Sequence, residues 1–274
     1  MPYVGHAYVV GLTGSPGVGK STSTAAIVSA FRSRDCRVGV LAIDPSSPFS
    51  GGALLGDRVR MQDHATDSGV YIRSMGSRGH LGGLSWSTPQ ALRVLDAAGC
   101  DVVLIETVGV GQAEVEVASL ADTTVVLVAP GMGDGIQAAK AGILEIADVF
   151  VVNKADRDGA DAAARDLRNM LSLGDRAQWQ PPIVKTVASR GEGIDELMAA
   201  LDKHREWLAA SGRLDAKRRV RAADEIEAIA VTALRERMGD VRGGGLLDEL
   251  AGRVVAGDVD PYTAADQLIA GVTD

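Results

Sequence analysis

The chain has 274 residues, with 28 Lys and Arg against 36 Asp and Glu, which gives a formal net charge of −8. That length fits one large domain with an appendage, and an acidic chain without a long basic run is not typical of proteins that bind nucleic acid. The two cysteines are far apart in the sequence, so we predict neither disulfides nor a zinc motif. No apolar run approaches the ~18 residues of a membrane span, and no charged-then-apolar leader is seen, which predicts a cytoplasmic protein without membrane contact.

Short apolar runs alternate with segments of helical period along most of the chain. The runs that predict strands are residues 8–12, 38–43, 102–105, 124–128, 149–152 and 183–187. Helices are predicted at 21–34, 194–210, 216–238 and 261–270. Because the apolar runs lack polar alternation, they indicate strands buried on both faces. We therefore predict a doubly wound α/β fold with a mostly parallel sheet.

Loops and domain limits follow from composition. Residues 45–56 and 73–83 predict long loops, which are usually functional inside a compact domain. Residues 1–210 are expected to form the main domain, and residues 211–274 a helical extension interrupted at Gly243-Gly244-Gly245. An extension of that size cannot hold a core alone, so it is expected to dock on the main domain or on a partner subunit.

The segment from Gly14 to Ser21 matches the pattern GxxxxGKS and lies between a predicted strand and a predicted helix. Glycines let the backbone curl so that amides point inward, and the helix N-terminus adds partial positive charge. We expect Lys20 to reach the β- and γ-phosphates of a nucleotide and the Ser21 hydroxyl to bind Mg²⁺. The alternative is a glycine-rich turn that binds nothing. The expected phosphate-binding residues are Gly14, Ser15, Pro16, Gly17, Val18, Gly19, Lys20, Ser21 and Thr22.

Asn153-Lys154-Ala155-Asp156 follows the apolar run 149–152, so it is predicted at the carboxyl end of a strand. The Asp156 carboxylate can accept two hydrogen bonds from guanine, whereas adenine would leave that carboxylate unpaired. Lys154 can lie along the base. The pattern predicts GTP and GDP as ligands, although four residues of this kind also occur in surface turns. Backbone amides of the next segment are expected to close the base pocket, at Ala188, Ser189 and Arg190.

Acidic side chains follow several predicted strands. Glu106 can hold Mg²⁺ directly or through water, and the Gly109 amide can meet the γ-phosphate. Asp44 and Asp57 are further candidates for Mg²⁺ or for orienting the attacking water, although Asp57 is equally typical of a helix N-cap. Lys140 can neutralise transition-state charge or can be a solvated helix lysine. The expected metal ligands are Ser21, Asp44, Asp57 and Glu106, and the expected catalytic residues are Lys20, Asp44, Asp57, Glu106 and Lys140.

Other side chains give weaker indications. His80 and Arg78 lie in a predicted loop, where an exposed structural role is the simpler interpretation. Trp86, Trp179 and Trp207 are interpreted as packing residues without a stacking arrangement.

Five segments resemble one known family, the MeaB/ArgK/MMAA family of P-loop GTPases. The string Glu-Thr-Val-Gly-Val-Gly-Gln is far more specific than a P-loop, and the resemblance covers almost the whole chain. The segments are residues 41–47 (LAIDPSS), 50–58 (SGGALLGDR), 106–114 (ETVGVGQAE), 133–140 (GDGIQAAK) and 255–265 (VAGDVDPYTAA).

The resemblance implies a homodimeric, Mg²⁺-dependent GTPase that is a chaperone of an adenosylcobalamin-dependent acyl-CoA mutase, typically methylmalonyl-CoA mutase. In that family, nucleotide binding and hydrolysis gate cofactor loading and protect the mutase, and the cobalamin is expected to be handled by the mutase rather than by this chain. No metal cluster is expected in this chain. Residues 130–140 match a switch loop, and residues 211–274 match the dimer contacts. By position, the residues implicated around magnesium and in hydrolysis are Asp44, Asp57, Glu106 and Lys140.

Two departures from the family pattern are visible. Family members carry a helical N-terminal extension, whereas the first predicted strand here begins within ten residues of Met1. A second basic residue beside Lys140 is also missing.

Three alternatives remain open. One is an ATP-dependent kinase or transport-system ATPase, against which the Asn153–Asp156 motif argues. Another is a metal-insertion GTPase, which needs a His/Cys cluster that the scattered histidines of this chain do not indicate. The third is a module that binds nucleotide without turnover.

Overall fold

The computed structural model describes residues 5–44, 61, 64, 66–76, 87–107, 113–131, 143–173, 178–238 and 245–273. The chain divides into two compact units, Met1–Arg218 and Arg219–Asp274.

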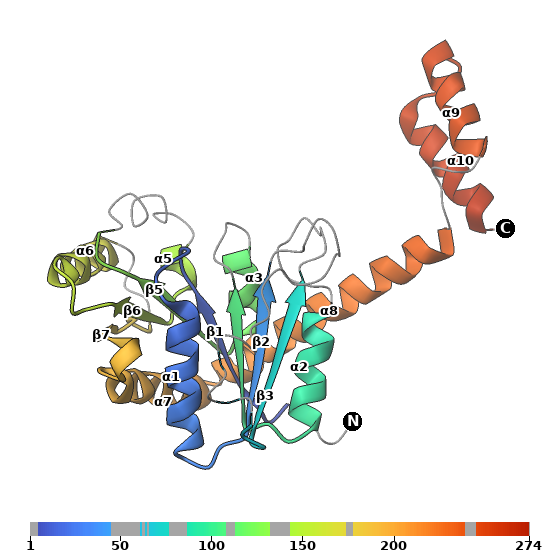
Figure 1. Ribbon diagram of the computed structural model, residues 1–274. Coiled ribbons are helices and arrows are strands. Elements are labelled where there is room, and N and C mark those ends of the chain that lie inside the picture. Colours follow the sequence, from blue (N-terminus) through green and yellow to red (C-terminus); the bar gives the residue numbers. More distant parts are fainter. Residues whose placement is uncertain are drawn as a thin grey trace. The chain divides into compact units, whose positions relative to one another are not determined.

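The first unit is built on a parallel sheet in the order β3-β2-β4-β1-β5-β6-β7 (Figure 1). Every pairing of neighbouring strands in this sheet is parallel, and the non-consecutive order places a crossover helix between most of them. The strands are β1 (Tyr8–Thr13), β2 (Val38–Asp44), β3 (Val70–Gly76), β4 (Val102–Thr107), β5 (Thr123–Val128), β6 (Val149–Asn153) and β7 (Ile183–Thr186).

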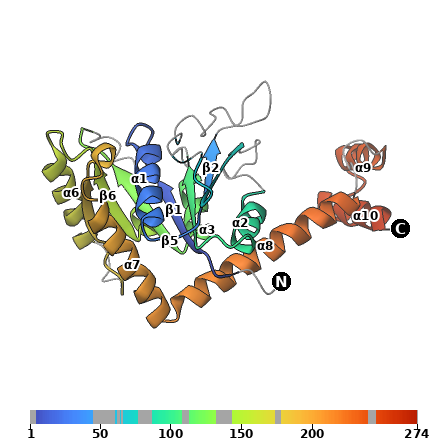
Figure 2. The same ribbon diagram turned by 60° about the horizontal axis from the view of Figure 1, so that its bottom comes forward.

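Helices cover both faces of the sheet. Alternate residues of each strand point to opposite faces, so Val10 packs with Phe31 and Leu201 on one side, while Val9 packs with Leu95 on the other. Figure 2 shows α1 and α7 next to each other over the first of these faces. The helices are α1 (Lys20–Arg32), α2 (Thr88–Ala97), α3 (Ala113–Leu120), α5 (Ile143–Ile146), α6 (Ala160–Leu173), the short η3 (Ala188–Arg190), α7 (Ile194–Ala210) and the start of α8 (Arg213–Met238).

This arrangement confirms the predicted doubly wound α/β fold. The prediction of a loop over 73–83 is wrong in its first part, because residues 70–76 form the edge strand β3, paired with β2. An edge strand is half exposed: the Tyr71 side chain is 53% exposed, and Arg73 is exposed too. Polar residues at alternate positions therefore replace the continuous apolar run that identifies the central strands.

Two tryptophans of the first unit pack in one aromatic cluster with His204, and the Trp179 and Trp207 rings are tilted by 38° rather than stacked. The Trp179 ring centroid lies 5.3 Å from that of Trp207 and 4.7 Å from that of His204. The His204 ring is fully buried, and its Nδ1 lies 2.7 Å from the Thr123 hydroxyl. Residues from α7, β5 and the segment before β7 meet here, a contact that no local sequence pattern records.

The second unit contains the rest of α8 with α9 (Gly245–Ala256) and α10 (Pro261–Thr273). The predicted last helix corresponds to α10, whose first amides at Tyr262 and Thr263 donate to the Asp260 carboxylate over 2.9 and 3.1 Å. The Thr263 hydroxyl also donates to this carboxylate and is the largest cause that lowers the pKa of Asp260, and the two amides lower it further. Sequence periodicity did not indicate α9. No helix among the described residues is long and apolar enough to cross a membrane.

Candidate functional site

The candidate site lies at the carboxyl ends of β1, β4 and β6, the edge at which parallel sheets bind ligands. The loop of residues 14–19 leaves β1 there, and α1 begins directly after it at Lys20. The predicted strand, glycine-rich loop and helix therefore follow one another in space as in sequence.

Backbone shape in this loop depends on Gly14. Its φ of 140° lies in a region that L side chains rarely adopt, and a Cβ built on it would lie 2.2 Å from the Leu127 carbonyl oxygen of β5. The loop thus packs against the neighbouring strand at a distance that only glycine allows.

The Lys20 side chain folds back over the loop. It is only 7% exposed, and its ammonium donates to the carbonyls of Gly14 and Ser15 over 2.7 and 3.1 Å. A cation and the positive end of α1 are therefore both aimed at the concave side of the loop, where they can stabilise a triphosphate. Thr22, two residues further along, is exposed.

A buried acid meets α1 from β4. Glu106 is 6% exposed; the Ser21 hydroxyl donates to its Oε1 over 2.6 Å, and the Thr24 Oγ1 lies 3.0 Å from its Oε2. The structure thus brings together Ser21 and Glu106, which the sequence predicts as metal ligands. Thr24 was missed, although its place three residues after Ser21 on the helix could have indicated it.

Carboxylate and hydroxyl oxygens are the ligands that Mg²⁺ prefers, so Ser21 and Glu106 fit a magnesium site. Asp44 is the last residue of β2, and its neighbour Ile43 pairs with Thr107 of β4, so the Asp44 backbone reaches the same sheet edge. No group of three or more His, Cys, Asp or Glu side chains suited to a metal is found among the described residues. Predictions made for other residues lie outside the described part of the chain, namely Asp57, Gly109, Lys140, Arg78, His80 and Trp86.

Asn153 connects the base side of the site with the phosphate loop. Its side chain is buried at the end of β6, and its Nδ2 donates to the Val18 carbonyl over 2.9 Å. Its Oδ1 accepts hydrogen bonds from the Thr186 hydroxyl and from the Ala188 amide, both at 3.1 Å. One side chain of β6 therefore joins two other segments, the phosphate loop and residues 186–188, and Thr186 is a further partner that the sequence did not indicate.

The residues after Asn153 lie on the outer side of the same site. Lys154, with a φ of 57°, donates its ammonium to the Gly17 carbonyl over 2.6 Å. The Asp156 carboxylate is 35% exposed and pairs with the Arg190 guanidinium at 3.2 Å, while Arg190 also lies 3.7 Å from Glu192. The Asp156 carboxylate is therefore oriented and still accessible, as an acceptor for N–H groups of a base must be. Ser189, between Ala188 and Arg190, is exposed.

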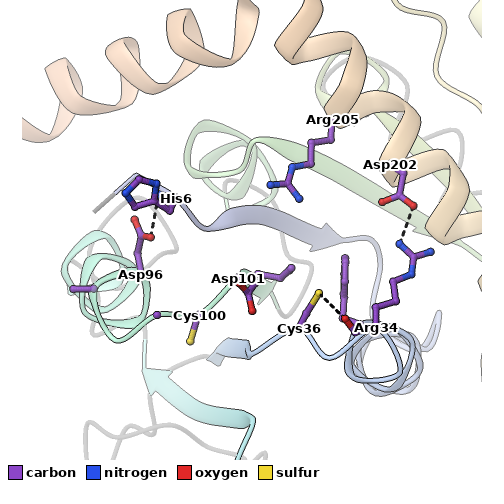
Figure 3. Close-up of a pocket in the computed structure, with 12 residues that line it drawn as sticks. His6, Arg34, Cys36, Asp96, Cys100, Asp101, Asp202 and Arg205 are labelled. Carbon is purple, nitrogen blue, oxygen red and sulfur yellow. Dashed lines mark hydrogen bonds and ion pairs between the residues drawn. The ribbon is translucent and has the colours of Figure 1, made fainter. Parts of the chain in front are cut away.

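A cavity of about 460 Å³ lies at the opposite, amino-terminal edge of the strands (Figure 3). Cys36 and Cys100 line it as free thiols, and burial raises the pKa of both. The Asp96 carboxylate there accepts hydrogen bonds from the His6 and Ala7 amides over 3.2 and 2.9 Å. The Asp96 carboxylate therefore holds the N-terminal segment against α2, at a place separate from the phosphate loop.

Comparisons with known proteins show the family of the chain. The family model described as methylmalonyl Co-A mutase-associated GTPase MeaB matches residues 1–241. A putative GTPase of Pyrococcus abyssi is 50% identical over 98% of this chain and 84% of its own length. A mouse protein, the mitochondrial methylmalonic aciduria type A homolog, is 41% identical over 76% of this chain and 52% of its own length.

Solved structures share the architecture. The crystal structure of a LAO/AO transport system kinase has a TM-score of 0.72 at 29% identity, covering 100% of this chain and 84% of that one. The structure of HypB from Helicobacter pylori in complex with nickel has a TM-score of 0.56 at 18% identity, over 73% of this chain and 88% of that one. The second likeness shows the fold alone.

Proposed function

This chain belongs to the MeaB family of P-loop GTPases and is a hydrolase acting on GTP, and on that premise we propose that it is a chaperone of an adenosylcobalamin-dependent acyl-CoA mutase. Methylmalonyl-CoA mutase is the expected client, because the family description names that enzyme. In this proposal GTP binding and hydrolysis gate the loading and protection of the cofactor, while the mutase itself holds the cobalamin.

The observation that carries the nucleotide part of the proposal is the hydrogen bond between Asn153 and Val18. It places the base-reading segment and the phosphate loop at a fixed spacing, so that one purine nucleotide can contact both. We assign guanine recognition to Asp156, with Lys154 along the base and the amides of residues 188–190 closing the pocket. Adenine would leave the Asp156 carboxylate without its donors.

At the phosphate end, the loop amides and the Lys20 ammonium bind the β- and γ-phosphates and orient the terminal one. Ser21 and Glu106 are the described residues that would hold Mg²⁺, and the sequence adds Asp44 and Asp57 as further candidates. When bound, the ion neutralises charge on the phosphates. Because Glu106 and Lys20 are buried, they act in a site from which much water is already excluded.

We assign residues 211–274 to homodimer formation. Large apolar side chains are exposed on the helices of the second unit, where a partner chain could bury them. A second copy of this chain is the proposed partner at that surface, in line with the resemblance described above. The exposed side chains include Val220 (61%), Ile226 (68%), Leu234 (58%), Val255 (90%) and Tyr262 (86%).

The chaperone proposal is tested by phosphate release from GTP, measured with and without methylmalonyl-CoA mutase loaded with adenosylcobalamin. We expect slow turnover alone and at least about tenfold acceleration with the mutase, as for GTPases that need a partner to complete the site. Lys20→Ala is the control for contaminating hydrolases and should release no phosphate in either case. Unchanged turnover in the presence of the mutase would contradict the chaperone role but not the GTPase activity.

The dimer proposal is tested by sedimentation. Val255→Glu should shift the chain toward the monomer, because it places a charge on apolar surface. Val94→Glu is the matched control, since Val94 is a 67% exposed side chain on α2 of the first unit. A monomer in the unchanged protein, or equal behaviour of both variants, would argue against a dimer through the C-terminal helices.

A further inference from the structure

We propose that Thr24 is a positioning residue for Glu106: its hydroxyl holds the second carboxylate oxygen, so that the first stays aligned with Ser21 for metal binding. This inference rests on the metal-binding role proposed above for Ser21 and Glu106. It concerns how the chain prepares that site.

The contact lies inside the protein. Thr24 is fully buried on α1, and its Oγ1 lies 3.0 Å from Glu106 Oε2 and 3.0 Å from the Lys20 carbonyl oxygen. The Ser21 hydroxyl donates to Oε1 of the same carboxylate over 2.6 Å. Two hydroxyls on adjacent turns of one helix face thus contact the two oxygens of one acid from β4.

The position of the hydroxyl proton decides between a local and a functional interpretation. A threonine inside a helix commonly donates to the carbonyl four residues earlier, and Lys20 offers that acceptor. An ionised carboxylate only accepts hydrogen bonds, so its oxygen is stable 3.0 Å from the Thr24 oxygen only if the proton points at least partly toward it. A bond to a charged acceptor is also about twice as strong as one to a carbonyl. The Thr24 hydroxyl therefore lies within hydrogen-bonding distance of two acceptors, and an ionised Glu106 carboxylate is the stronger of the two.

Attachment at two points has a mechanical consequence. A carboxylate held by a single donor rotates about its last carbon–carbon bond, whereas donors on both oxygens fix its plane. Threonine is stiff at χ1 because its Cβ is branched, so the Thr24 hydroxyl is itself fixed by the helix. Ser21 is a proposed metal ligand whose bonding changes with the ion, while Thr24 keeps the same partner throughout. Thr24 therefore holds the Glu106 carboxylate in the same orientation with and without the ion.

The experiment compares Thr24→Val, which keeps the shape and removes the hydroxyl, with Thr24→Ser, which restores it. The affinity for GDP is measured by calorimetry with excess Mg²⁺ and with EDTA. For Thr24→Val we expect unchanged affinity in EDTA and a Mg²⁺-dependent gain in affinity that is roughly tenfold smaller, the size of one hydrogen bond to a charged group. Thr24→Ser should recover most of that gain.

A second measurement is the Mg²⁺ concentration for half-maximal GTP hydrolysis, which should rise by about the same factor in Thr24→Val. Thermal melting of each variant without nucleotide checks that the fold is intact. Thr24→Ala supplies a second hydroxyl-free variant if valine overpacks the helix interface.

Glu106→Gln separates the failure of this inference from the failure of the proposed site. If Glu106→Gln keeps the normal response to Mg²⁺, the metal role of Glu106 is wrong. If Glu106→Gln loses that response while Thr24→Val keeps it, only the role of Thr24 is overturned. In the double variant, Thr24→Val should add no further loss, because its effect passes through Glu106; an additive loss would overturn the positioning role.

Discussion

The side-chain amide of Asn153 donates to the backbone carbonyl of Val18 over 2.9 Å, and the two residues are 135 positions apart. Asn153 ends β6 and Val18 lies in the loop after β1, so this bond joins the two halves of the nucleotide pocket. Both partners are buried, and the same side chain also receives hydrogen bonds from Thr186 and Ala188. Pocket geometry therefore depends on one residue that is not itself expected to touch the phosphates.

Asn153→Ala is accordingly expected to weaken GDP binding about tenfold, because a buried hydrogen bond is lost and the phosphate loop and residues 186–188 lose their common partner. Calorimetric titration with GDP and Mg²⁺ measures the effect. Asn169→Ala, on the exposed face of α6, is the matched control and should bind GDP normally. Normal binding by the Asn153 variant would show that the loop keeps its position without this bond.

Gly14→Ala is expected to be far more damaging than Gly17→Ala. A Cβ at Gly14 would overlap the Leu127 carbonyl oxygen, whereas a Cβ at Gly17 has no atom within 4 Å and meets only the cost of a φ of 81°. That conformational cost is about 1 kcal/mol. Urea denaturation should therefore show a small loss for Gly17→Ala and a loss of more than about 2 kcal/mol for Gly14→Ala, with loss of GDP binding. Equal losses would contradict the packing of Gly14 against β5.

Asp156→Asn is expected to exchange the base preference of the pocket. An amide offers a donor where the carboxylate offers an acceptor, so it no longer matches the guanine 2-amino group and can pair with the 2-carbonyl of xanthine. GTP affinity should fall by at least about a hundredfold while XTP affinity rises. Asp161→Asn is the control, because that carboxylate is 75% exposed and pairs only with Lys185 at 2.9 Å among the contacts described. A variant that still preferred GTP would remove Asp156 from base recognition.

His204 is expected to make stability fall at mildly acidic pH. Burial has the largest effect on His204 and lowers its pKa below the usual value of 6.5, and Lys217 lowers it further. The Asp148 carboxylate, whose Oδ1 lies 3.3 Å from Nε2, raises the pKa but does not outweigh burial. As the pH falls, the unfolded chain therefore binds this proton before the folded chain does. The stability contributed by neutral His204 is complete above about pH 6.5 and is lost as the pH falls through the folded-state pKa. Urea denaturation between about pH 5 and 7.5 should show this slope.

Replacing His204 by Gln should flatten the dependence in that window, even if the variant is less stable throughout. The acids whose pKa values are lowered, Asp67, Asp161 and Asp260, titrate well below this range and do not obscure the result. His6→Gln, at an exposed position, is the control and should keep the slope. An unchanged slope in the His204 variant would assign the acid sensitivity to other groups.

Arg218→Ala is expected to cost about 3 kcal/mol of unfolding free energy. Its guanidinium lies 2.9 Å from the Asp122 carboxylate, whose side chain is 1% exposed, and its removal leaves a buried charge with less compensation. Arg34→Ala breaks a pair with Asp202 of similar length, 2.8 Å, but both side chains are more than 40% exposed. That control should change stability by no more than about 0.5 kcal/mol. Similar losses for both variants would mean that burial does not set the strength of the Arg218 pair.

Much of the fold could be predicted because buried strands and glycine turns leave local patterns. The runs at 102–105 and 149–152 correspond to β4 and β6, and the GxxxxGKS motif lies at the predicted strand–helix junction. The prediction missed β3 because an edge strand is half solvated and loses that pattern. It did not indicate the contact of Trp179 with Trp207, because these rings come from segments that meet only in the folded chain.

For this protein, the sequence by itself determined the class of chemistry: a curled phosphate loop, an acid suited to guanine and the membership of a GTPase family. Each is encoded in a few consecutive residues whose backbone and side-chain preferences act locally. Only the tertiary structure decided how these parts are held, through the contacts of Asn153 with Val18, Thr24 with Glu106 and Arg190 with Asp156. Such contacts join residues tens of positions apart, and their distances follow from the packing of helices on a sheet, which no local pattern specifies.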